Sequence, residues 1–148
     1  MAETDLKKLY AGRILELAAD IPLSERLDAP DASVKKRSPL CGSTVTVDVV
    51  LRDGAISKFG QDVKACALGQ AAASVLGSVA IGRTLPEIEA ARDELRAMLT
   101  AGGPVPAAPF GEYSVLEPAR DFKNRHASIM LALEATAEAM AEAQAKAA

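Results

Sequence analysis

The stretch from Thr44 to Leu51 constrains the fold most strongly, because apolar side chains at positions 45, 47, 49 and 51 alternate with polar ones at 44, 46 and 48. A period of two is typical of a strand with one buried face. Asp53-Gly54 follows directly and predicts a tight turn into a second strand. The sequence therefore predicts an antiparallel hairpin, with strands at 44–51 and 56–65.

The length of the turn sets the register of this hairpin. A two-residue turn would pair Leu51 with Ile56 and would bring charged residues onto the valine face. A three-residue loop at 53–55, with its glycine in the left-handed conformation of a bulged turn, would instead pair Val49 with Phe59. We expect the second register, because it keeps the large apolar side chains together.

This register brings the two cysteines of the chain together. Val45 falls opposite Val63, and counting outward along the ladder places Gly42 opposite Cys66. Cys41 and Cys66 are therefore predicted to be near neighbours at one end of the hairpin.

Composition favours one folded domain over 1–148. The chain has 148 residues, 49% of them hydrophobic and 25% charged, which is typical of a soluble globular protein. A net charge of -3 and 3% aromatic residues give no basic or stacking surface, so we expect no nucleic-acid partner. No segment approaches the roughly 20 apolar residues of a membrane span, and residues 1–5 lack the features of a signal peptide. We expect a cytoplasmic protein without a membrane partner, where paired cysteines more often bind metal or react than form a structural disulfide.

The remaining segments predict an α+β fold, in which a small antiparallel sheet packs against several α-helices. A third strand is expected near 34–37, in a proline-broken connector whose run Lys35-Lys36-Arg37 is either a solvated surface or a docking site for an acidic partner. The helices are expected at these places: from a Thr4 cap to before Pro22; Cys66–Ile81, rich in small residues; from a Thr84–Glu87 capping box to about Thr100; a short turn or helix at 113–120; and a long C-terminal helix at 124–145.

Three side chains are candidate metal ligands. Cys66 lies where a strand gives way to a helix, and a helix N-terminus favours the thiolate. Cys41 precedes Gly42 in a loop that can bend around a bound atom. His126, the only histidine, begins the apolar stripe of the last helix. Zinc and iron accept two sulfurs and one nitrogen, although buried inert thiols and a hydrogen-bonded core histidine would explain the same residues.

The residues around these candidates resemble the IscU/NifU-type family of iron–sulfur cluster assembly scaffolds. The likeness rests on Ser-Pro-Leu-Cys-Gly at 38–42, Lys-Ala-Cys-Ala-Leu-Gly-Gln-Ala-Ala-Ala-Ser at 64–74, and Arg125-His126 near the start of the last helix. The resemblance implies a non-enzymatic protein that receives sulfur from a cysteine desulfurase, binds iron or zinc, and builds a transient [2Fe-2S] cluster for acceptor proteins. Cys41 and Cys66 match the first two cluster cysteines of the family.

The chain departs from the family pattern at three places. Ser43 replaces an aspartate that can bind metal, Ala127 stands where the third cysteine is expected, and Phe-Lys-Asn-Arg at 122–125 replaces the chaperone-recognition stretch. The resemblance then implies ligands from the two cysteines and His126, with Ser43, water or the second subunit of a homodimer in the last position. The alternatives are a degenerate paralogue that acts as a binding module without a cluster, and a zinc-binding or sulfur-accepting protein. A thiol–disulfide or sulfur-transfer enzyme with Cys66 as nucleophile ranks last, because no neighbouring base is evident.

Overall fold

A computed structural model describes residues 12–39 and 41–147 of the chain. The predicted Thr4 cap and the beginning of the first predicted helix lie outside these residues. The elements, in chain order, are α2 (Arg13–Ala19), β1 (Ala32–Arg37), β2 (Thr44–Arg52), β3 (Ala55–Lys64), α3 (Ala67–Val79), α4 (Leu85–Ala101), the 3₁₀ helix η1 (Gly111–Asp121) and α5 (Lys123–Ala147).

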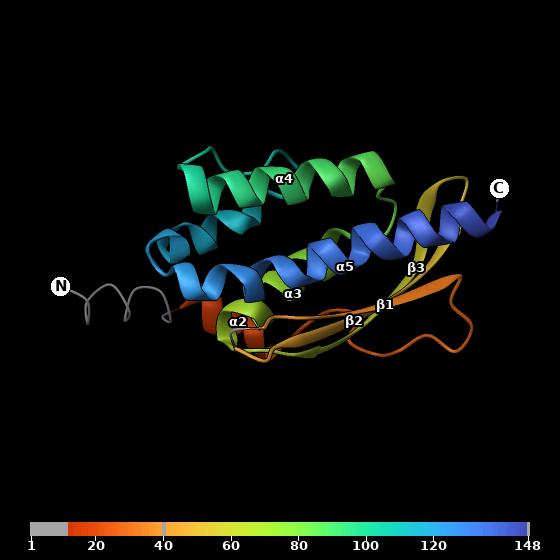
Figure 1. Cartoon of the computed structure of the whole chain (residues 1–148), viewed down its shortest axis with the longest axis horizontal. Helices are drawn as coiled ribbons and strands as arrows, with labels where there is room; N and C mark the ends of the chain where they lie inside the picture. Colours follow the sequence, from red (N-terminus) through yellow and green to blue (C-terminus); the bar gives the residue numbers. More distant parts are fainter. Residues whose placement is uncertain (1–11, 40, 148) are drawn as a thin grey trace.

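The three strands form one antiparallel sheet in the order β1-β2-β3, which confirms the predicted α+β class and the third strand. The long helix α5 packs against β1 and β2, and both α3 and α4 pack against α5. Figure 1 shows α5 running along the molecule between the sheet and α4. The ends of β1 and β3 and the starts of β2, α3 and α5 therefore meet at one end of the molecule.

The hairpin combines features of both registers considered from the sequence. Val49 lies opposite Phe59, as expected, but the turn has two residues, because Arg52 pairs with Ala55. A register shift at Val50/Leu51 reconciles the two halves of the ladder. The expected three-residue loop is therefore wrong, and the extra residue lies in the strand as a β-bulge.

The turn itself explains this outcome. Asp53 and Gly54 both have positive φ angles, 54° and 80°. Two successive residues of this kind form the hairpin turn whose twist matches that of the strands. A bulge a few residues away then restores the pairing that buries the valines, which are 0–1% exposed at positions 45, 47 and 49.

The connector between α2 and β1 covers the polar face of β2. Asp48, which the alternation places on the half-exposed face, is fully buried there. Its carboxylate accepts hydrogen bonds from Nε and Nη2 of Arg26 at 2.7 and 3.1 Å, from the backbone N–H of Leu27 at 2.9 Å, and from the hydroxyl of Ser33. An ion pair between the buried carboxylate of Asp48 and the half-exposed guanidinium of Arg26 thus anchors the connector to the sheet.

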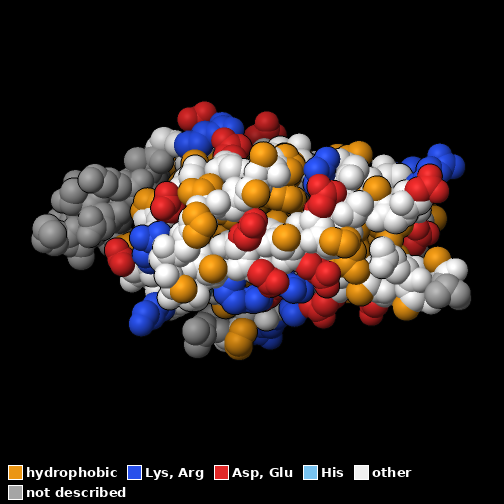
Figure 2. All heavy atoms as spheres, turned by 90° about the horizontal axis from the view of Figure 1, so that it is seen from above, with side chains coloured by type: hydrophobic (Ala, Val, Ile, Leu, Met, Phe, Trp, Pro, Cys, Tyr) orange, Lys and Arg blue, Asp and Glu red, His pale blue; other side chains and the backbone are white. Residues whose placement is uncertain are grey.

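The helices that follow the hairpin agree with the sequence expectations. Thr84 and Glu87 form the predicted capping box at the start of α4. Figure 2 shows acidic and basic side chains interspersed over the face that includes α4 and α5, where Arg96 pairs with Glu134 and Lys36 of β1 pairs with Glu138. Among residues 12–39 and 41–147, no helix is both long enough and apolar enough to cross a membrane.

Candidate thiol site

Cys41 lies in the loop that joins β1 to β2. The loop is closed by two backbone hydrogen bonds, from Ser38 N–H to the carbonyl of Ser43 at 2.8 Å and from Gly42 N–H to the carbonyl of Ser38 at 3.0 Å. Gly42 has a φ of 71°, a conformation that glycine adopts without strain. The turn leaves Cys41 exposed while the flanking Ser38 and Ser43 are buried.

Cys66 occupies the N-cap position of α3, directly after β3, as the sequence predicts. Its side chain makes no cap hydrogen bond to the helix, so its sulfur is free to face another group. That group is Ser128 of α5, whose Oγ lies 3.6 Å from the sulfur of Cys66.

Two buried hydroxyls connect the cysteine sulfurs. The Sγ of Cys41 lies 3.2 Å from Oγ of Ser43. Ser128 donates to the same Ser43 oxygen at 3.1 Å and contacts the sulfur of Cys66. The predicted proximity of the two cysteines is therefore realised through a chain of four side chains from three separate segments.

Gly69 allows this close approach of α3 and α5. A Cβ atom at this position would lie 2.5 Å from Oγ of Ser128 and 2.8 Å from Cβ of Ala65. Real contacts of that length are repulsive. The absence of a side chain at Gly69 therefore leaves room for Ser128 beside Cys66.

The surrounding hydroxyls favour the thiolate of Cys41. Its pKa is lowered from 9.0 to about 7, first by the hydrogen bond with Ser38 and then by that with Ser43. Burial acts in the opposite direction but is weaker. The neutral thiol donates to Oγ of Ser38 at 3.3 Å. Once the thiol has lost its proton, the hydroxyls can turn to donate to the sulfur and stabilise the charged form, so Cys41 combines exposure with nucleophilic character at neutral pH.

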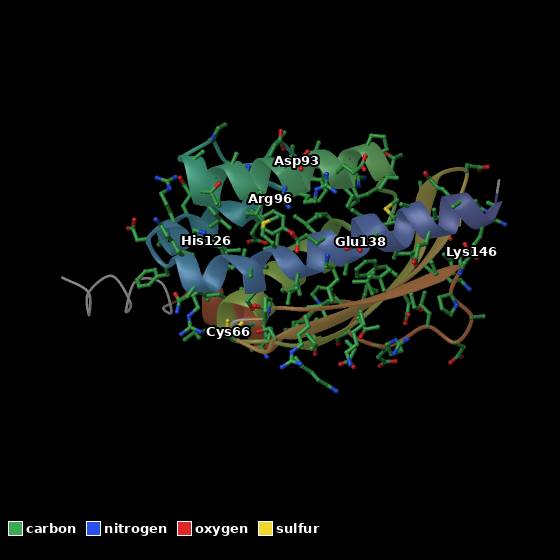
Figure 3. The ribbon with its side chains drawn as sticks, viewed as in Figure 1. Cys66, Asp93, Arg96, His126, Glu138 and Lys146 are labelled. Carbon is green, nitrogen blue, oxygen red and sulfur yellow. The ribbon has the colours of Figure 1, made fainter. Side chains whose placement is uncertain are left out.

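His126 lies at the same end of the molecule as Cys66, and Lys146 lies at the opposite end (Figure 3). Nε2 of His126 lies 2.9 Å from the carbonyl oxygen of Ala119 and 3.2 Å from that of Arg120. Because a carbonyl oxygen only accepts hydrogen bonds, Nε2 carries the proton, and its hydrogen bonds connect η1 to the first turn of α5. Only Nδ1 remains for a metal, and the ligand role of His126 stays a prediction.

Within the described ranges 12–39 and 41–147, no three His, Cys, Asp or Glu side chains gather as they would around a metal ion. The site instead offers two sulfurs and the hydroxyls of Ser43 and Ser128. Ser43 was a candidate from the sequence, whereas Ser128 was missed. The only feature of the sequence that could have indicated Ser128 is its position two residues after His126, because the family resemblance implies that the start of this helix lies near the site.

The chain matches no protein-family model and no curated protein. Solved structures do match. A nitrogen-fixing NifU-like protein (N-terminal) from Brucella abortus shares 43% sequence identity, covers 96% of this chain and 99% of its own, and superposes with a TM-score of 0.93.

Two more distant structures share the fold alone. A proposed iron–sulfur cluster assembly scaffold for the SUF system from thermophilic Fervidobacterium islandicum AW-1 is 16% identical, with a TM-score of 0.79 over 90% of this chain and 98% of its own. A hypothetical protein is 24% identical, with a TM-score of 0.80 over 91% of this chain and 98% of its own.

The fold and the paired thiols define a small α+β protein with a sulfur site at the end of its sheet. Together with the close relative, they show that the chain belongs to the NifU-like family of iron–sulfur cluster assembly scaffolds. The resemblance seen in the sequence is thus confirmed at the level of the family.

Proposed function

We propose that the protein holds iron and a transient [2Fe-2S] cluster as cargo for delivery to acceptor proteins, with Cys41 and Cys66 as its sulfur ligands and Ser43 as a further donor. The observation that carries the proposal is the continuous contact from one sulfur to the other through two buried hydroxyls. Thiolates are the usual protein ligands of iron–sulfur clusters.

The small number of sulfurs suits temporary binding. A [2Fe-2S] cluster normally has four protein ligands, and one chain supplies two cysteines. Hydroxyls, His126 through Nδ1, or the cysteines of a second subunit would provide the others. A homodimer with two sulfurs from each subunit fits the exposure of Cys41 at one end of the molecule. Each of these ligand sets would bind the cluster more weakly than four thiolates within one chain, and weak binding is what a cluster that is passed on requires.

Sulfur supply is the step that the structure of Cys41 favours. Its exposed thiol, with a pKa of about 7, is the better nucleophile of the site for the persulfide of a cysteine desulfurase. The thiolate would attack the outer sulfur, forming a new S–S bond while the bond to the desulfurase cysteine breaks, and that cysteine leaves as a thiolate. No oxidant is required, because the transferred sulfur keeps its oxidation state.

A binding module without a cluster is the second candidate. It is favoured by the hydrogen bonds that hold Nε2 of His126 on the carbonyls of η1. Such a protein would keep the family fold to bind partners of the assembly machinery. Zinc held by the two thiols is a third form of the same site.

Anaerobic reconstitution with ferrous iron and sulfide separates these candidates. The proposal predicts a sulfur-to-iron charge-transfer band that is lost in Cys41→Ala and in Cys66→Ala. Ser114→Ala, at an exposed position in η1, is the control and should behave as the parent. A parent protein that retains neither iron nor sulfide would leave the binding module as the function.

A further inference from the structure

The structure divides the basic run Lys35-Lys36-Arg37, because neighbouring side chains of a strand point to opposite faces of the sheet. Lys36 points toward α5, where its Nζ lies 2.6 Å from a carboxylate oxygen of Glu138. Lys35 and Arg37 therefore lie on the outer face of the sheet, which is the face opposite α5. Both are exposed, and neither forms an ion pair with another residue of the described ranges.

Lys64 of β3 lies on the same face as these two side chains. The register pairs Arg37 with Thr44 and Thr44 with Lys64, so these residues form one row across the sheet. Lys35 and Asp62 lie at the two ends of the next row. The carboxylate of Asp62 is 3.9 Å from Nζ of Lys64, and both side chains are exposed. The two rows thus carry three cations and one carboxylate, in a chain whose net charge is -3.

The helices leave this part of the outer face open. Helix α5 packs against β1 and β2 on the inner face, and Gln61 of that face donates to the carbonyl of Ala73 in α3 at 3.0 Å. The connector covers the outer face at Asp48, which Arg26 binds. Positions 44 and 46, in the two rows nearer the cysteines, remain partly exposed.

The basic rows are continuous with the thiol site. Arg37 ends β1 directly before the loop that carries Cys41, and Lys64 ends β3 two residues before Cys66. A protein that reaches the exposed Cys41 would therefore meet these cations as well, and an acidic surface is complementary to them. A nucleic acid fits less well, because the chain is acidic overall and has only 3% aromatic residues.

We propose that Lys35, Arg37 and Lys64 form a docking surface for an acidic patch of the protein that supplies sulfur to Cys41. The inference rests on the proposed function and specifies the face through which that partner approaches. Opposite charges accelerate the encounter and orient the partners more than they tighten the complex. Basic side chains on an edge strand also prevent strand addition, but that role alone would leave sulfur transfer unchanged.

Sulfur transfer from the cysteine desulfurase of the same organism tests the inference. The acceptor is Cys66→Ala, in which Cys41 is the only thiol, and NaCl is varied from about 25 to about 400 mM. The second-order rate constant should fall as salt rises, because salt screens the attraction. Adding Lys35→Gln and Arg37→Gln should lower the rate constant by on the order of tenfold at low salt. The two proteins should converge at high salt.

Two controls separate docking from other effects. Arg52→Gln with Lys58→Gln removes the same charge from exposed positions at the other end of the sheet, and should not change transfer. Iodoacetamide is neutral and needs no docking, so it should alkylate Cys41 at the same rate with and without the substitutions at 35 and 37. This is expected because serine hydrogen bonds and burial set the pKa of this thiol.

Several results would overturn the inference. Transfer that the substitutions at 35 and 37 leave unchanged at every salt concentration would do so, as would an equal loss in the control pair, which would report net charge alone. A duplex DNA oligonucleotide that binds the parent but not the variant would assign the surface to nucleic acid. Circular dichroism and size-exclusion chromatography check folding, and Lys64→Gln alone should slow transfer severalfold if the double substitution causes aggregation.

The proposed function can fail independently of this surface. Reconstitution with inorganic iron and sulfide uses no donor protein, so it tests cluster binding alone. Slower transfer to the variant, together with a parent that retains no iron, would refute the cluster and leave the docking surface. A parent that accepts no sulfur from the desulfurase would refute the docking surface, whether or not it retains a cluster.

Discussion

The reactivity of Cys41 should depend on pH in a way that its neighbouring hydroxyls determine. In a Cys66→Ala background Cys41 is the only thiol. With a pKa of about 7 instead of 9.0, about half of it is thiolate at pH 7, compared with about one part in a hundred for an ordinary thiol. The population of the reactive form is thus raised roughly fiftyfold.

The lower pKa also weakens each thiolate as a nucleophile. With a Brønsted coefficient of about 0.4–0.5, a shift of this size reduces its intrinsic reactivity roughly six- to tenfold. The net prediction is alkylation roughly five- to eightfold faster than that of an ordinary thiol at pH 7, and severalfold slower above pH 10. The two rate profiles should therefore cross.

Iodoacetamide alkylation of the metal-free protein between pH 5 and 10, followed by mass spectrometry, measures this profile. Ser38→Ala and Ser43→Ala should each move the apparent pKa upward, since each removes a hydrogen bond to the thiolate. An apparent pKa near 9 in the parent background, or one that neither serine substitution changes, would refute the role assigned to the hydroxyls.

Three substitutions outside the two cysteines test how the fold supports the site. Gly69→Ala should cost about 1–3 kcal/mol of unfolding free energy in urea, because its methyl group would lie 2.5 Å from Oγ of Ser128. Asp48→Asn should cost about 1–3 kcal/mol at pH 7 by the same measurement. Burial alone would raise the pKa of Asp48, but its hydrogen bonds lower it below 3.8, so its stabilisation is present above that pH and is lost in acid. His126→Ala should cost about 1 kcal/mol of unfolding free energy by freeing η1, and a lower iron content per chain would show that Nδ1 also serves as a ligand.

Each of these three predictions would be contradicted by a specific result. Gly111→Ala is the control for the first, since nothing lies within 4 Å of the added atom; equal stability of both glycine variants would refute the clash with Ser128. A stability difference for Asp48→Asn that is as large at pH 3 as at pH 7 would contradict the charged interaction. An unfolding free energy of His126→Ala equal to that of the parent would refute a stabilising role for the hydrogen bonds from His126 to η1.

Local pattern was enough to predict the hairpin and the meeting of its ends, because a buried valine face permits few registers. The position of the bulge was not predictable, since a two-residue turn and a displaced extra residue satisfy the same apolar pairing as a three-residue loop. The burial of Asp48 depends on Arg26 in a distant connector. A period of two indicates on which face of the sheet a side chain lies. It does not indicate which other segment of the chain covers that face.

The candidate site was predicted only in part, because the local sequence pattern defines the hairpin but not the helices that pack against it. Cys41 and Cys66 belong to the two ends of one hairpin, so counting along the ladder brought them together. Ser128 comes from a helix that packs across the sheet, and its approach depends on the missing side chain of Gly69. The direction of His126 depends on the carbonyls of η1, a short element that periodicity defines poorly.

The proposed function requires that Cys41 and Cys66 together hold iron–sulfur cargo. Its most direct test is the iron and acid-labile sulfide content of the protein purified without air, beside that of Cys41→Ala/Cys66→Ala. Iron and sulfide are expected in the parent and neither in the double variant. Equal contents in the two proteins, or none in the parent even after anaerobic reconstitution, would contradict it.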